Sequence, residues 1–224
     1  MEDVVVGVGI SVVVGLLLWP RGARGELRTA CPALYRAIAL LLAEAFGRIL
    51  APGAAEGSSQ ARGMAVAARD RAEEALDQYL RERAAQPLDA EAAGSLSAAG
   101  ADAILAADLL ERLADTGYRT RGRSDADAAL HDQVRALVGA FVRLADRLDA
   151  RESAAADGER LSTEALRAAA LAYVHCWQED PEQGRAAIAA VVAAQWIQGL
   201  GALAASLEQP VGEVVEAARA PWWR

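Results

Sequence analysis

The hydrophobic pattern of the chain begins with one long uncharged run. No charged residue interrupts the sequence from Val4 to Trp19. As a helix this run is about 24 Å long, and with its flanking residues it is just long enough for a hydrocarbon core of roughly 30 Å. The pattern predicts a transmembrane helix over residues 1–20 and a separate domain over residues 21–224.

The charges on either side of this run predict its orientation. Only the acids Glu2 and Asp3 precede it, whereas Arg21 and Arg24 follow it. Because arginine-rich flanks stay on the cytoplasmic side, we expect a single-pass protein of the inner (plasma) membrane with a cytoplasmic C-terminal domain. The acidic start and the bulky end at Trp19 do not fit a secretory signal peptide, which has a basic start and a small-residue cleavage site.

A second interpretation of the same run is open. The stretch is rich in valine, which favours strands, so a buried strand pair or a core helix of a soluble protein is the alternative. No other segment has the pattern of a strand, and a lone strand has nothing to pair with. Gly7, Gly9 and Gly15 would let neighbouring helices approach closely, which favours a span that packs against other spans.

The rest of the chain has helical periodicity. Apolar residues recur every three or four positions, which predicts helices over about 24–49, 61–85, 90–114 (or 97–114), 162–177, 181–207 and 210–220, besides one around 130–148. The first of these would be kinked or split at Pro32. The apolar residues expected to face the core include Ala68, Ala72, Leu76, Tyr79, Leu80, Ile104, Leu105, Leu109, Leu113, Ile188, Val191, Val192, Trp196, Leu200 and Leu203. The pattern predicts an all-α fold, an antiparallel multi-helix bundle.

The most regular spacing defines what we call the apolar seam. Its members recur at alternating intervals of four and three residues, at Leu130, Val134, Leu137, Phe141, Leu144 and Leu148. This spacing is typical of helices that pack in bundles and coiled coils. We expect the seam to be an interaction surface.

Three helix starts carry capping residues. Ser124 with Asp127 can cap the helix around 130–148. Ser162 can cap one helix, with Leu161 and Leu166 at the positions of a hydrophobic staple. Asp180 followed by Pro181 is typical of a helix start. The aspartate side chain accepts hydrogen bonds from the unpaired backbone N–H groups of the first turn, and proline has no N–H that would be left unpaired there.

Composition and charge narrow the classes of function. The net charge is -8, and acids and arginines alternate without forming a basic surface, which argues against nucleic acid as a partner. Cys31 and Cys176 are the only cysteines, so we expect neither a metal cluster nor a disulfide framework. The small number of cysteines also favours a reducing compartment. One basic cluster lies between glycines and is interpreted as a solvated loop, with an anion or lipid headgroup contact as the alternative: Arg119, Arg121 and Arg123.

The sequence contains few candidates for catalysis. The stretch YVHCWQED brings together His175, Cys176, Glu179 and Asp180. A nucleophilic thiol needs a base opposite it in space, however, and these residues are neighbours along one helix end. The other titratable candidates are expected at caps or on solvated faces: His131, Glu73 with Glu74, and Asp125 with Asp127. We expect no enzyme activity, no cofactor and no metal site.

The C-terminal residues Pro221–Arg224 place two tryptophans beside an arginine. Because tryptophan favours the boundary between membrane and water, we expect this tail to return to the bilayer near Trp19 and Arg21. The alternative is that the tail fills a groove of the bundle.

Three stretches of the sequence resemble a known family. The run EDVVVGVGISVVVGLLLWPRGARGELR, the helix LYRAIALLLAEAF after it and the final ARAPWWR are similar to the C-terminal end of the FUSC family, the fusaric acid resistance or aromatic acid exporter type of membrane protein. In that family, blocks of transmembrane helices alternate with helical cytoplasmic domains. The resemblance implies that this chain corresponds to the final transmembrane helix and the cytoplasmic domain after it, with a part in efflux of small aromatic or other organic acids.

One span cannot enclose a route for a polar solute. The resemblance therefore implies a structural or gating role, with the other spans supplied by a larger transporter or by further copies in a homo-oligomer. The residues expected to carry this role are Val4–Trp19, Arg21 with Arg24, and the apolar seam. None of these residues is expected to bind substrate. The alternative function is a stand-alone membrane-anchored helical scaffold that binds a protein partner through the seam.

Overall fold

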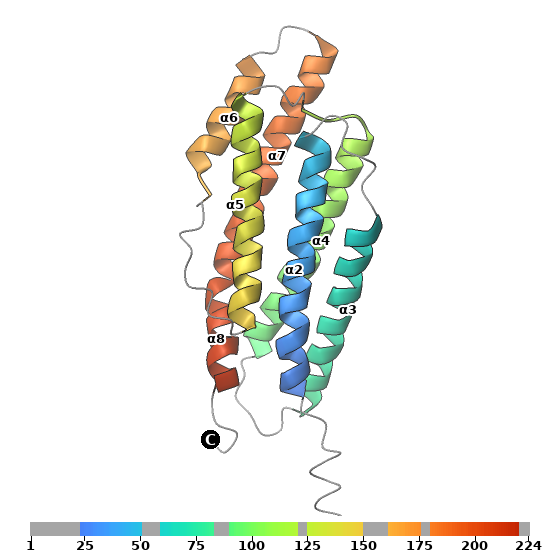
Figure 1. The fold of residues 1–224 in the computed structure, drawn as a ribbon, viewed down its shortest axis with the longest axis vertical. Helices are drawn as coiled ribbons and strands as arrows, with labels where there is room; N and C mark the ends of the chain where they lie inside the picture. The colour runs from blue at the N-terminus through green and yellow to red at the C-terminus, as the bar shows by residue number, and fades with distance from the viewer. Residues whose placement is uncertain are drawn as a thin grey trace, which may run out of the picture.

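A computed structural model describes residues 23–50, 59–82, 90–120, 125–149, 161–175 and 180–219. Its helices, labelled as in Figure 1, are α2 (Ala23–Leu50), α3 (Ser59–Glu82), α4 (Ala90–Asp115), α5 (Asp125–Leu148), α6 (Thr163–His175), α7 (Pro181–Ser206) and α8 (Glu208–Arg219). These ranges contain no strand, so the expected all-α bundle is confirmed. The expected transmembrane helix over residues 1–20 lies outside the described residues.

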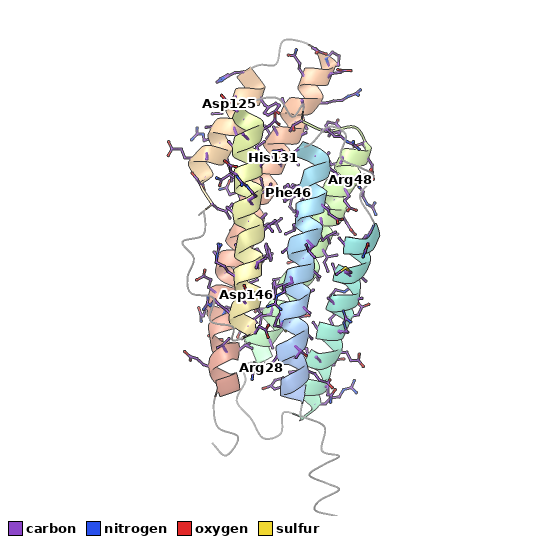
Figure 2. The ribbon with its side chains drawn as sticks, viewed as in Figure 1. Arg28, Phe46, Arg48, Asp125, His131 and Asp146 are labelled. Carbon is purple, nitrogen blue, oxygen red and sulfur yellow. The ribbon has the colours of Figure 1, made fainter. Side chains whose placement is uncertain are left out.

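Helix α2 lies at the centre of the bundle, packed against α3, α4 and α5. Helix α5 also packs against α6 and α7, while α8 lies against α4 and α5. The antiparallel arrangement is visible in Figure 2, where Arg28 near the start of α2 lies toward the same end as Asp146 near the end of α5, and Asp125 lies at the opposite end.

The two ends of the described chain lie at the same end of the bundle. Helix α2 begins and α8 ends at the lower end in Figure 1, which we call the proximal end. Helix α6 ends and α7 begins at the opposite, distal end. Segments that precede α2 or follow α8 therefore both join the bundle at its proximal end.

The apolar seam is the inward face of α5. All six of its side chains are buried, and the Phe141 ring lies fully buried with its centroid 6.2 Å from that of Tyr35 on α2. The Tyr35 hydroxyl donates a hydrogen bond of 2.8 Å to the Leu96 carbonyl of α4, so one side chain links three helices. The seam is covered by the chain's own helices and offers no free surface to a partner.

Helix α2 continues through Pro32 and is not split there. A proline inside a helix removes one backbone hydrogen bond and costs about 3 kcal/mol. Burial of α2 against three neighbours outweighs that cost, because Leu34, Ile38, Leu41 and its other inward side chains are almost completely covered.

Much of the core is made of alanine. The inward face of α3 is a row that we call the alanine seam, formed by Ala61, Ala65, Ala68, Ala72 and Ala75. Helix α7 likewise buries Ala189, Ala190 and Ala193 completely. Small side chains let helix backbones approach closely, so these two helices pack largely through methyl groups, with Tyr79 of α3 and Ile197 and Leu200 of α7 buried as well.

Several large apolar residues expected in the core are exposed instead. Leu105 and Leu109 of α4 are 57% and 44% exposed, Leu80 of α3 is 40% exposed, and Ile188 and Val191 of α7 are 49% and 37% exposed. These large apolar residues were expected to face the core, whereas buried alanines occupy many of the inward positions of α3, α4 and α7. Of the other expected core residues, Ala68, Ala72, Tyr79, Ile104 and Leu200 are buried, and Leu76, Leu113, Val192, Trp196 and Leu203 are partly buried.

Two of the three expected helix caps are confirmed, and the one at Ser124 lies outside the described residues. The Ala165 N–H donates to Ser162 Oγ at 3.1 Å, and Leu166 is buried as the staple requires. The Glu182 N–H donates to Asp180 Oδ1 at 3.0 Å, with Pro181 as the first residue of α7. These side chains satisfy backbone groups that a helix start otherwise leaves unpaired.

Two stretches of the described chain are long and apolar enough to cross a membrane, Glu91–Asp115 and Pro181–Glu216. About half of each is buried inside the bundle, as is also typical of core helices in soluble proteins. Membrane association is therefore supported only weakly by the described residues.

Candidate functional site

The buried acid Asp127 is one correction to the sequence-based expectations. It was expected at a cap with Ser124, which lies outside the described residues, or on a solvated face; the solvated face is wrong, because Asp127 is 4% exposed and accepts a hydrogen bond from the Tyr173 hydroxyl of α6. The nearby His131 is partly buried, with Nδ1 2.8 Å from the Asp127 carbonyl oxygen (Figure 2). A buried carboxylate needs such donors, so this cluster joins α6 to α5 and serves packing.

The other sequence candidates do not come together as a site. Asp180 is used as the cap of α7, His175 is exposed at the end of α6, and Glu73 and Glu74 are exposed on α3. The arginine of the basic cluster that is described, Arg119, donates to the Ala114 carbonyl at 3.2 Å. Cys176, Glu179, Arg121 and Arg123 lie outside the described residues.

A charged network joins α4 to its neighbours near the distal end. Arg48 of α2 pairs with Asp115, and Arg62 of α3 pairs with Asp108 at 2.7 Å. Burial raises the pKa of Glu111 between them, although both arginines act in the opposite direction. The acids of this network face arginines of neighbouring helices, and it serves to hold α2, α3 and α4 in register.

A second ionic link connects α2 to α5. Arg36 lies 2.9 Å from Asp146 and 3.1 Å from Asp149, and the hydrogen bond to Asp146 is the main cause that raises the pKa of the Arg36 guanidinium. The Asp146 and Asp149 carboxylates are thereby directed to α2, away from the other face of α5.

The side of α5 that bears Arg143 and Arg147 borders a groove of about 310 Å³, next to Leu144 of the apolar seam. The groove lies between the second half of α5, the start of α6 and the junction of α7 with α8. Its lining consists of Ala136, Ala140, Arg143, Leu144, Arg147, Leu161, Gly201, Ala204, Ala205 and Glu208. The volume is at the lower end of the range of about 300–1,000 Å³ for small-ligand sites. We call it the arginine groove.

The charged groups of the arginine groove make few contacts among the described residues. Arg143 has no hydrogen-bond or ion-pair partner among the residues that the structure describes, and its Nη1 lies 3.2 Å from the position a Cβ would take on Gly139. Arg147 faces Glu208 at 3.8 Å, with both side chains largely exposed, at 48% and 70%. Such an exposed pair is worth less than about 1 kcal/mol, so a better acceptor can replace Glu208.

The chemistry of the groove fits one class of molecule. Guanidinium groups bind carboxylates through paired hydrogen bonds, whereas the alanine and leucine walls favour an apolar body. Among the described residues, two arginines against one glutamate give the groove a positive local charge in a chain of net charge -8. The arrangement is therefore complementary to a small organic anion.

Of the residues of this groove only Leu144 was expected to be functional, as a member of the apolar seam, although the sequence carries a signal for the others. Ala136, Ala140, Arg143 and Arg147 recur at the same alternating four- and three-residue spacing as the apolar seam, one position before it. A row of small residues that ends in two arginines on one helix face indicates a site where apolar walls meet positive charge.

No protein-family profile, no curated protein and no solved structure matches this chain. Among the described residues, no three His, Cys, Asp or Glu side chains lie together so that they could hold a metal ion. The arginine groove is the candidate site on which the functional argument rests.

Proposed function

We propose that the chain is a membrane-anchored cytoplasmic helical domain of a FUSC-like exporter of small aromatic or organic acids, with a structural or gating role. Residues 1–20 would be its single span in the inner membrane, beside further spans of the transporter or other copies of the chain. The observation that carries the proposal is the arginine groove, whose charge and apolar walls suit an organic acid.

The position of the groove supports a gating role. A carboxylate bound to Arg147 would compete with Glu208, the first residue of α8, for the same guanidinium. Occupancy of the groove would thus alter a contact between α5 and α8. Helix α8 ends at the proximal end, where the proposed span also joins the bundle (Figure 1).

Binding of an aromatic acid is the direct test. We expect the purified full chain to bind 2-naphthoate in equilibrium dialysis, and Arg143→Gln with Arg147→Gln to weaken binding at least about tenfold. The reason is that charge-assisted hydrogen bonds contribute about 1.5–3 kcal/mol each. Arg112→Gln, at an exposed arginine of α4, should leave the affinity unchanged.

The ester of the same ligand provides a second control. Methyl 2-naphthoate has the apolar body without the charge and should bind far more weakly than the acid. Equal affinity for acid and ester, or wild-type affinity in the double arginine variant, would show that the groove does not recognise organic anions.

The proposed anchor has its own test. We expect the full chain to sediment with membranes and to resist extraction by high salt and alkaline carbonate, and a chain lacking residues 1–20 to move to the soluble fraction. The effect should be nearly complete, because the Val4–Trp19 run supplies the apolar length of the proposed span. Retention of the truncated chain in the membrane would contradict the proposal that residues 1–20 are the single span.

A further inference from the structure

Leu161 differs from the other apolar residues that line the arginine groove. Most of these residues are alanine or glycine, whose small size leaves the groove open: Ala136, Ala140, Gly201, Ala204 and Ala205. Leu144 is 4% exposed and belongs to the buried apolar seam. Leu161 is partly buried and lies just before α6. Among the described residues that line the groove, it is therefore the one large apolar side chain outside the apolar seam.

The backbone beside Leu161 is held against α5. The Ser162 N–H donates a hydrogen bond of 2.7 Å to Gln133 Oε1, and Gln133 is 6% exposed. Ser162 also caps α6 through its hydroxyl group. Breaking the bond to Gln133 would leave a buried carboxamide without this partner, which costs free energy. The start of α6 therefore has a fixed position on α5.

The Leu161 side chain lies directly on the backbone of α7. A Cβ atom on Gly201 would overlap the Leu161 Cδ1 atom and would lie 3.6 Å from its Cγ atom. Carbon atoms that are not bonded to each other pack at about 3.5–4.0 Å, so the leucine can lie here only because residue 201 is glycine. The side chain is thus fixed by α7, and its backbone by α5.

The contact between Leu161 and Gly201 lies away from the pair of Arg147 and Glu208. Ala140 precedes Arg147 by seven residues and Gly201 precedes Glu208 by seven, which is about 10 Å along a helix. Helices α5 and α7 both run from the distal to the proximal end (Figure 1). Leu161 therefore borders the distal part of the groove, and a ligand whose carboxylate pairs with Arg147 extends its apolar body toward Leu161.

We propose that Leu161 determines the specificity of the arginine groove by limiting the length of the acid that it binds. The inference rests on the proposed function, because it concerns the ligand of the same groove. An acid with one ring fits between the arginines and Leu161, whereas a second ring in line with the first meets the leucine side chain. The groove volume of about 310 Å³, at the lower end of the range for small-ligand sites, agrees with this length limit.

Equilibrium dialysis of the full chain against benzoate and biphenyl-4-carboxylate tests the length limit. In wild type the longer acid should bind no more tightly than benzoate, although its apolar surface is larger. Leu161→Ala should strengthen binding of biphenyl-4-carboxylate relative to benzoate at least about tenfold, because even one methylene group in a closed pocket changes affinity that much. Leu171→Ala makes the same change at an exposed position of α6 outside the groove and should leave this ratio unchanged.

Gly201→Ala should change the same ratio in the opposite direction. The added methyl group displaces the Leu161 side chain, and both take space from the groove, so biphenyl-4-carboxylate should weaken about tenfold relative to benzoate. When Gly201→Ala is combined with Leu161→Ala, this loss should be largely absent, because the Cδ1 atom that the methyl group would overlap has been removed. General destabilisation of the bundle would weaken both acids alike and leave the ratio unchanged.

The possible outcomes separate the length limit from the proposed function. Binding of both acids with the same ratio in wild type, Leu161→Ala and Gly201→Ala would overturn the length limit but leave the groove as a site for organic acids. Tighter binding of biphenyl-4-carboxylate than of benzoate in wild type would also overturn the limit. If wild type binds neither acid although it unfolds cooperatively on heating, the proposed function is wrong and so is the limit.

Discussion

Replacing Phe141 with alanine should lower the free energy of unfolding by about 3–5 kcal/mol, the cost of removing a buried aromatic ring. Phe141 is completely buried in the middle of the apolar seam. Its ring stacks with Tyr35, whose hydroxyl donates to the Leu96 carbonyl of α4. Loss of the ring therefore leaves a cavity where α2, α4 and α5 meet, which closely packed neighbours cannot fill.

The matched control for this change is the next residue of α5. Val142 is 37% exposed, so Val142→Ala should cost less than about 1 kcal/mol. Both variants can be compared by urea denaturation followed by far-ultraviolet circular dichroism. Similar midpoints for the two variants would mean that α5 does not face the core through the apolar seam.

Replacing Ala68 with leucine should destabilise the bundle by about 1–3 kcal/mol, even though leucine is more hydrophobic. Ala68 is 3% exposed in the middle of the alanine seam, where α3 packs closely on α2. The larger side chain can be accommodated only if the two helices separate or other side chains leave their preferred rotamers.

Ala67 of the same helix provides the control for Ala68. It is exposed, so Ala67→Leu should change stability by no more than about 0.5 kcal/mol. Thermal unfolding of the two variants under identical conditions gives the comparison. If Ala68→Leu were the more stable protein, the close contact between α3 and α2 would be wrong.

The helices themselves could be predicted because local patterns determine them. The regular spacing of the apolar seam identified the inward face of α5, since all the charged residues of that helix lie off the seam. The Asp180 and Ser162 caps located two helix starts, because capping depends on residues within one turn. These features need no knowledge of the rest of the molecule.

The inward face of α7 could not be predicted in the same way. This helix is apolar on nearly all sides, so its own sequence contains little information about which side meets the core. The surrounding helices select the side that carries Ala189, Ala190 and Ala193 together with Ile197 and Leu200, and Ile188 and Val191 remain outside. That selection depends on long-range packing.

Long-range contacts also explain the misjudged polar residues. Asp127 lies in the first turn of α5, where an exposed acid is common, and its burial follows from Tyr173 far along the chain. The arginine groove likewise exists only because Gly201 and Ala204 of α7 lie opposite Arg143 of α5. Sequence periodicity placed the arginines on one helix face but could not supply the opposing wall.

The alanine seam also has a consequence for how the bundle fluctuates. A buried methyl group removes little apolar area from water, so burial stabilises α3 by a smaller free energy per residue than it does α2 or α5. Native proteins open first where the least apolar area is lost. Transient detachment of α3 would uncover one side of α2 while the Tyr35–Phe141 stack stays closed, so amide protons of α3 should exchange with solvent before those of the seam.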